Sequence, residues 1–168
     1  MLEVDIDRTR EWDGQADWER IAEDAVKAAF SVSSHGDLAE APFTLSISIR
    51  LSDDGEVHEL NRQWRDKDKP TNVLSFPMLE TDELDALANT DDGEVLLGDM
   101  ILAYGVCAAE AEEKAIPLAR HASHLIVHGT LHLLGLDHID DGEAEQMETL
   151  EVKALASLGI ANPYADQD

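Results

Sequence analysis

The stretch HGTLHLLGLDH, residues 128–138, contains three histidines and two glycines, and their spacing decides how this part of the chain folds. Residues four apart on an α-helix are neighbours on one face, with β-carbons about 5 to 6 Å apart, so His128 and His132 can point at one ion. Gly135 is free to adopt a left-handed conformation, which would end the helix and turn the chain back. That turn would bring His138 to the same place. We therefore expect a helix that ends beside three clustered imidazoles.

These three imidazoles are a ligand set typical of a catalytic zinc site. A structural zinc site has four protein ligands, whereas three leave a fourth position open. Nitrogen ligands also favour zinc over magnesium or calcium, which prefer oxygen. We therefore expect one zinc ion held by His128, His132 and His138. The alternative is that the histidines lie at the surface or in the core without a metal, but the glycine at plus seven and the histidine at plus ten disfavour coincidence.

The sequence does not decide the roles of three other polar residues in or near this stretch. His124 lies one helical turn before His128, with His121 close to it, and either could hydrogen-bond a metal ligand or carry a proton. Packing or surface exposure is the favoured interpretation for both. Asp137 could orient a ligand imidazole, activate a metal-bound water or cap the next segment, and the sequence leaves these alternatives open.

The spacing His-x-x-x-His-x-x-Gly-x-x-His is also that of metzincin proteases, which carry a glutamate general base directly after the first histidine. Gly129 occupies that position here. The missing base disfavours a peptidase, although a zinc hydrolase that acts on a peptide or another substrate remains an alternative.

The hydrophobic periodicity of the whole chain predicts an α+β fold. Alternating or short apolar runs predict strands at residues 2–7, 44–51, 73–76 and 95–103. Apolar residues three and four apart predict helices at residues 18–32, 55–64, 106–116, 118–134 and 141–158. The acidic segment 80–94 is expected to form a loop. Because three helices gather at the C-terminal end after several strands, the pattern favours α+β over a regular α/β alternation.

Length and composition indicate a single ordinary globular domain. The 168 residues fit one domain, residues 1–168, which we interpret as a metal-dependent hydrolase domain. No stretch has the roughly 18 to 20 apolar residues needed to cross a bilayer, and residues 1–5 do not resemble a signal peptide. The single cysteine, Cys107, cannot form an internal disulfide and is expected to be a buried, inert thiol. We expect a cytoplasmic protein without membrane contact.

The charge balance restricts any nucleic-acid function. Twelve Lys and Arg against 37 Asp and Glu give a formal net charge of −25, which repels phosphate backbones and disfavours non-specific binding. An RNA function therefore needs a local basic patch or a bound cation. Four basic residues do lie close together, at Arg62, Arg65, Lys67 and Lys69. The alternative is a solvated helix end with interleaved aspartates.

Three blocks of the sequence resemble one known family. HGTLHLLGLDH resembles the signature of the YbeY family of endoribonucleases, also called rRNA maturation factors. Residues 60–77, LNRQWRDKDKPTNVLSFP, and residues 97–101, LGDMI, are similar to two further blocks, in the family's order. The chain departs from the family pattern at Asn72, which stands where we expect Asp, and at Leu136, which stands where we expect Tyr.

The resemblance implies a single-strand-specific, zinc-dependent endoribonuclease in 16S rRNA 3′-end maturation and in quality control of the small ribosomal subunit. It implies a zincin-like α+β fold, with a mixed sheet of about four strands packed by about five helices. It also implies RNA and the small ribosomal subunit as partners, with no DNA expected. The family's arginine aligns with Arg65, and its zinc ligands align with His128, His132 and His138.

The chemistry of these residues suggests how such an enzyme would work. Zinc held by three neutral histidines lowers the pKa of its water to about 7, while Arg65 can grip a phosphate through two hydrogen bonds. The nucleophile, water or the RNA 2′-hydroxyl, is left open. The alternatives are a surface ion pair of Arg65 with Asp66 or Asp68, and a non-catalytic ribosome-assembly factor. Trp64 and Phe76 are expected to be core residues rather than base-stacking platforms.

Overall fold

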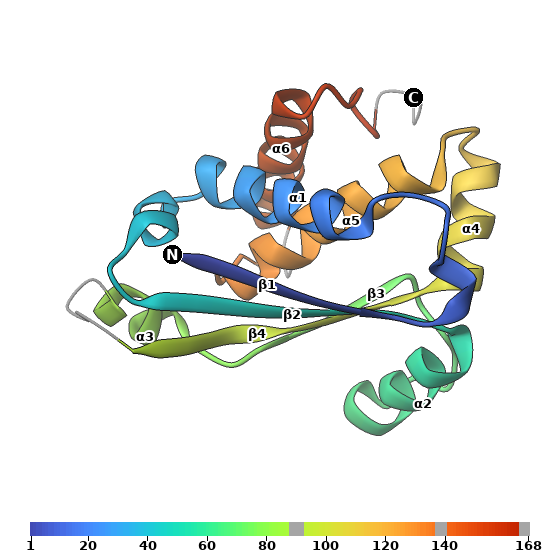
Figure 1. Cartoon of the computed structure of the whole chain (residues 1–168), viewed down its shortest axis with the longest axis horizontal. Coiled ribbons are helices and arrows are strands. Elements are labelled where there is room, and N and C mark those ends of the chain that lie inside the picture. The colour runs from blue at the N-terminus through green and yellow to red at the C-terminus, as the bar shows by residue number, and fades with distance from the viewer. Residues whose placement is uncertain (88–92, 137–140, 165–168) are drawn as a thin grey trace.

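The computed structural model describes residues 1–87, 93–136 and 141–164, in which helices cover a four-stranded mixed sheet (Figure 1). The strands are β1 (Leu2–Arg8), β2 (Thr44–Ser52), β3 (Val73–Pro77) and β4 (Glu94–Ala103), and their spatial order is β1-β2-β4-β3. β1, β2 and β4 are parallel, while β3 runs antiparallel to β4 at the sheet edge. The predicted α+β class and mixed sheet are confirmed.

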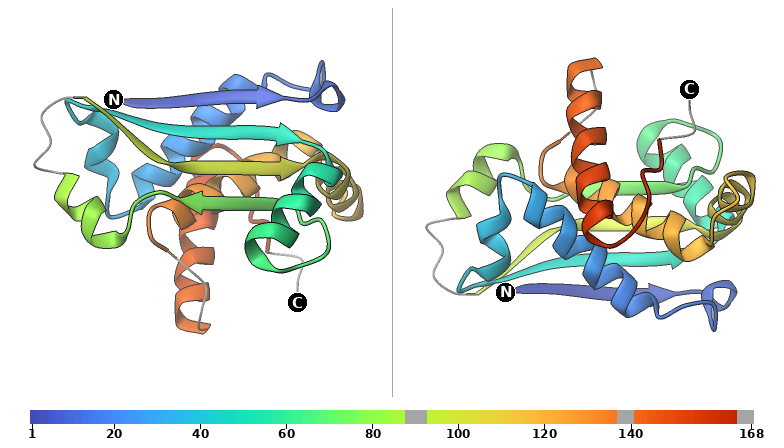
Figure 2. Two further views of the ribbon diagram at one scale, coloured as in Figure 1. Left: turned by 90° about the horizontal axis from the view of Figure 1, so that it is seen from below. Right: turned by 90° about the horizontal axis from the view of Figure 1, so that it is seen from above.

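Six α-helices of the described residues pack around this sheet. They are α1 (Trp18–Val32), α2 (Asp54–Arg65), α3 (Thr81–Ala86), α4 (Tyr104–Glu113), α5 (Leu118–Leu133) and α6 (Asp141–Ser157). α1 and α5 lie over one face of the sheet and α2 lies on the other side (Figure 1, Figure 2). Within the described ranges, no helix combines the length and the apolar character that a bilayer crossing requires.

The main core lies between the sheet and helices α1 and α5. Side chains alternate between the two faces of a strand, and in β2 the buried apolar residues are Leu45, Ile47, Ile49 and Leu51. On the opposite face, Val57 of α2 packs with apolar residues of β3 and β4 in a smaller cluster. This second cluster holds α2 against the sheet edge formed by β3.

Two glycines affect how closely α5 lies against the sheet and where it ends. This helix carries His128 and His132. A β-carbon at Gly129 would lie 2.7 Å from the Cε of Met100 in β4, so a side chain there would require the buried Met100 to shift. The helix ends at Leu133, and Gly135 has a φ of 100°, in the left-handed region. The predicted helix end at this glycine is confirmed.

The expectation of a loop at residues 80–94 is wrong for its first part, where α3 forms. Glu80 and Glu83 make a capping box at the start of this helix, and Leu84 and Leu87 are buried in the main core. The sequence pattern did not indicate this helix, because the segment is highly charged and only two apolar residues, three apart, mark its inner face. Residues 88–92 lie outside the described part of the chain.

Candidate functional site

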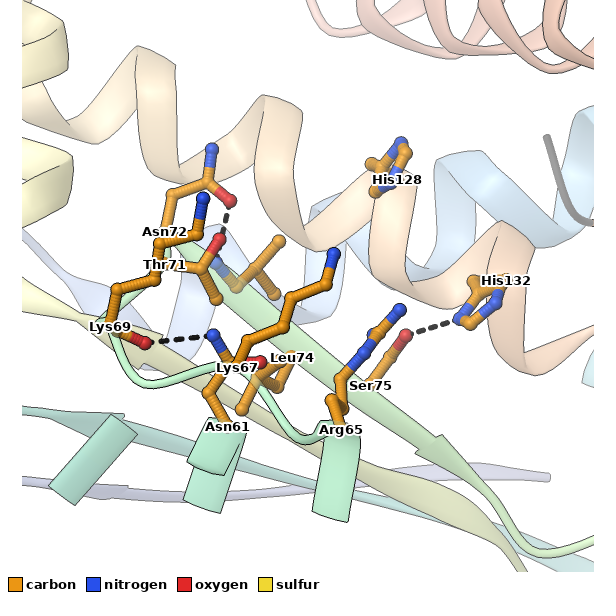
Figure 3. Close-up of a pocket in the computed structure, with 11 residues that line it drawn as sticks. Asn61, Arg65, Lys67, Lys69, Thr71, Asn72, Leu74, Ser75, His128 and His132 are labelled. Atoms are coloured by element: carbon orange, nitrogen blue, oxygen red, sulfur yellow. Dashed lines mark hydrogen bonds between the residues drawn. The ribbon is translucent and has the colours of Figure 1, made fainter. Parts of the chain in front are cut away.

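A cavity of about 290 Å³ opens at the edge of the sheet, where α5, β3 and the end of α2 meet (Figure 3). Its lining comes from segments far apart in sequence. Lining residues are Asn61, Arg65, Lys67, Lys69, Thr71, Asn72, Val73, Leu74, Ser75, His128 and His132. The structure thus brings two of the three predicted metal ligands and the predicted catalytic arginine to one place.

Each of the two histidines has a partner at its Nδ1 atom. The Oγ of Ser75 in β3 lies 2.5 Å from the Nδ1 of His132, and Figure 3 shows this interaction across the cavity wall. The Nδ1 of His128 lies 3.4 Å from the Oε1 of Glu151 in α6. Metal-binding histidines usually have such a partner on one ring nitrogen while the other nitrogen binds the metal. The two described rings therefore fit a metal site in which Nε2 is the ligand atom.

The third predicted ligand, His138, and its neighbour Asp137 lie in residues 137–140, outside the described part of the chain. Among the residues that the structure does describe, no three His, Cys, Asp or Glu side chains are grouped so that they could hold a metal ion. The zinc ion and its three-histidine ligand set therefore stay predictions.

Arg65 is the last residue of α2, and the local fold directs it into the cavity. Asp66 ends the helix in a left-handed conformation, with a φ of 57°, and its N–H donates to the carbonyl of Asn61. The buried Asn61 also donates from Nδ2 to the carbonyl of Lys69 at 2.8 Å, which folds the following segment back along the helix. Figure 3 shows Arg65 extending toward Ser75 and His132.

The alternative interpretation of Arg65, a surface ion pair with a neighbouring aspartate, is not supported. Asp68 lies 2.7 Å from the Nε2 of His58, and Arg62 pairs with Glu59. Within the part of the chain that the structure describes, Arg65 forms no ion pair. Its charge is therefore available to a ligand in the cavity.

The cavity contrasts in charge with the rest of the molecule. Three cationic side chains line it, Arg65, Lys67 and Lys69, and no carboxylate of a described residue does so. The whole chain carries a formal net charge of −25. A cavity of this kind attracts anions that the remaining surface repels.

Comparison with known proteins identifies the family of this chain. The family model described as Endoribonuclease YbeY matches residues 6–159. A protein named Endoribonuclease YbeY from Rhizorhabdus wittichii is 60% identical over 165 residues, 98% of each chain, and one from Sphingopyxis alaskensis is 58% identical over the full length of both chains. The chain belongs to the YbeY family.

The solved structures add a comparison of the fold. The solution structure of TM1509 from Thermotoga maritima superimposes with a TM-score of 0.54 at 20% identity, covering 95% of this chain and 92% of that one. The YbeY-family chain therefore shares its overall architecture with TM1509.

The expectation that Trp64 is a core residue is wrong. Its side chain is 67% exposed, whereas Val57, on the same face of α2, is fully buried and Leu60 packs against the smaller cluster. The apolar face of α2 therefore extends one turn beyond the residues that the sheet covers. This leaves an indole in solvent directly before Arg65. Phe76 is half-buried against the smaller cluster, as expected.

Glu151 is a polar residue beside this site that the sequence pattern did not predict. It is 1% exposed and its Oε1 lies 2.7 Å from the Nε2 of His124. Burial raises the pKa of this carboxyl, but hydrogen bonding to His124 and His128 outweighs it and lowers the pKa to about 2. A signal was present in the sequence, because Glu151 lies between Met147 and Leu155 on the apolar face of α6.

His121 and Cys107 are buried, and neither lines the cavity. The Nε2 of buried His121 lies 2.8 Å from the Oε1 of Glu110, which also accepts a hydrogen bond from Asn72, and burial lowers the pKa of His121. Cys107 is fully buried, as expected, and burial raises its pKa to about 12. The amide of Asn72 thus ties the cavity wall to α4.

Proposed function

We propose that this protein is a zinc-dependent endoribonuclease that cleaves single-stranded RNA. The observation that carries the proposal is the make-up of the cavity, where two histidines of α5 lie with three cations and no described carboxylate. In a chain of net charge −25, such a cavity suits a phosphate backbone. Membership of the YbeY family, whose matched relatives bear the name endoribonuclease, supports the same activity.

The residues of the cavity would have different roles in phosphodiester cleavage. His128, His132 and the predicted third ligand His138 would hold the ion. When bound, zinc supplies Lewis acidity at a phosphoryl oxygen and lowers the pKa of a water to about 7. Ser75 orients the ring of His132. Arg65 is permanently charged and forked, so it can hold the scissile phosphate through two hydrogen bonds.

A path for the RNA leads from this cavity over the end of α2. Lys67 and Lys69 extend the positive rim beyond Arg65. The exposed indole of Trp64 offers a flat surface on which a base can stack. Stacking requires a base face that is not covered by its neighbours in a duplex, so this arrangement favours unpaired RNA.

We further propose 16S rRNA 3′-end maturation and quality control of the small ribosomal subunit, in the cytoplasm, as the role of this activity. The support is the resemblance to the family and the charge of the molecule. Since its acidic surface repels RNA outside the cavity, the small subunit would have to present the RNA end. Neither DNA nor a membrane is expected as a partner.

The test is the substitution His132→Ala, with His35→Ala as a matched control. His35 lies away from the cavity, near Asp85 of α3. Zinc content would be measured by elemental analysis, and cleavage would be followed on a single-stranded oligoribonucleotide and on the same sequence as a duplex, with and without chelator. We expect wild type and His35→Ala to contain zinc and to cut the single strand, and His132→Ala to lose both properties.

A folded, metal-free His132→Ala protein that cleaves at the wild-type rate would refute the proposal. Loss of cleavage with ribosome assembly intact would favour a non-catalytic assembly factor instead. The chemical ends of the product identify the nucleophile, because a 2′,3′-cyclic phosphate excludes direct attack by water.

A further inference from the structure

A single buried oxygen connects His128 to the C-terminal segment. The Oε1 of Glu151 accepts a hydrogen bond from the hydroxyl of Tyr164 at 2.9 Å and lies 2.7 Å from the Nε2 of His124. The same atom lies 3.4 Å from the Nδ1 of His128. Of these three neighbours, only His128 lines the cavity.

A buried carboxylate is costly unless donors surround it, and here the donors come from two elements besides its own. His124 and His128 are one turn apart on α5, and Tyr164 follows α6 in the chain. His124 and Tyr164 are also within hydrogen-bond distance of each other, at 3.1 Å. The position of the carboxylate is thus fixed from two sides, independently of His128.

A carboxylate beside one nitrogen of an imidazole determines where the ring carries its proton. With Glu151 next to Nδ1 of His128, the proton of the neutral ring is favoured on Nδ1 and the lone pair on Nε2. The corresponding partner of His132 is the uncharged hydroxyl of Ser75. Glu151 thus gives the ring of His128 an anionic partner at Nδ1.

We propose that Glu151 is a positioning residue of the metal site, which fixes the orientation and tautomer of His128, and that His124 and Tyr164 hold Glu151 in place. This inference rests on the metal site of the proposed function. It implies that Tyr164, in the C-terminal segment, helps to keep the metal ligand His128 in position.

The test compares zinc affinities of Glu151→Gln and of the control Glu148→Gln. Glu148 is exposed on the same helix and loses the same charge. Affinity would be measured by competition with a chromophoric chelator, and the geometry by the visible absorption of bound Co²⁺. We expect zinc to bind about 10- to 100-fold more weakly to Glu151→Gln, with a changed Co²⁺ spectrum, and unchanged values for Glu148→Gln.

Tyr164→Phe provides a second test that leaves the buried charge in place. Its control is Tyr104→Phe, at the other tyrosine of the chain, whose hydroxyl contacts Gln15. We expect a several-fold loss of zinc affinity for Tyr164→Phe alone, and this variant decides the matter if Glu151→Gln does not fold.

The outcomes separate this inference from the function on which it rests. A wild-type protein that binds no zinc would overturn the metal site together with the role of Glu151. A wild-type protein that binds zinc, with a folded Glu151→Gln variant within twofold of its affinity and an unchanged Co²⁺ spectrum, would overturn the role of Glu151 alone.

Discussion

At the scale of single residues, the two arginines near the end of α2 differ in their surroundings. Arg62 pairs with Glu59, whereas Arg65 lines the cavity and forms no ion pair among the described residues. Removing a preorganised donor to the reacting group of an enzyme typically lowers the rate about 100- to 1,000-fold. We predict a loss of this order in kcat/KM for RNA cleavage by Arg65→Ala, with unchanged zinc content.

The matched control for this prediction is Arg62→Ala, which removes the same charge one helical turn away. Its kcat/KM should stay within about twofold of wild type, since exposed ion pairs contribute little. An equal loss in both variants would mean that the general positive charge of α2, and not a specific contact of Arg65, supports cleavage.

The buried thiol of Cys107 gives a prediction for alkaline stability. Burial raises its pKa from 9.0 to about 12, so the thiol stays protonated in the folded protein where it ionises in the unfolded chain. Above pH 9 unfolding therefore releases a proton, and the free energy of unfolding should fall by at most about 1.4 kcal/mol per pH unit from this group. Urea titrations of wild type and Cys107→Ala between pH 8 and about pH 10 measure the difference; parallel stability curves for the two proteins would contradict it.

At the scale of elements, the end of α2 is expected to bind RNA through Trp64. Stacking on an aromatic side chain contributes about 1 to 3 kcal/mol per base. We therefore predict that Trp64→Ala weakens binding of a single-stranded oligoribonucleotide about 5- to 150-fold, while Trp64→Phe retains most of the affinity.

Tryptophan fluorescence offers a direct measurement of this binding. Trp12 and Trp18 are buried, at 0% and 1% exposure, so quenching by RNA would report on Trp64. Unchanged affinity in Trp64→Ala, measured in a zinc-containing protein, would show that the exposed indole serves another purpose.

The elements also show which features the sequence determines locally. The histidine face of α5 and its end at Gly135 follow from spacing and from the conformational freedom of glycine, and both were predictable. The small helix α3 was not predicted because its segment is highly charged, and the exposure of Trp64 depends on where the sheet lies, which periodicity does not reveal. The position of Glu151 on the apolar face of α6 indicated that it is buried, but its three partners are known only once α5, α6 and Tyr164 are placed.

At the scale of the whole molecule, the site depends on contacts between distant segments. Ser75 and His132, for example, are 57 residues apart and meet because β3 occupies the sheet edge beside α5. The family blocks indicated that these segments belong to one site, but their geometry required the fold. The same fold gathers three cations at one cavity of a strongly acidic chain.

The most direct test of this account is X-ray diffraction from crystals of the zinc-loaded protein, with data on both sides of the zinc absorption edge. We predict an anomalous peak at about 2.0 to 2.1 Å from the Nε2 atoms of His128, His132 and His138. A zinc-soaked crystal without such a peak, in which the rings of His128 and His132 diverge and leave no room for a cation, would contradict the catalytic metal site.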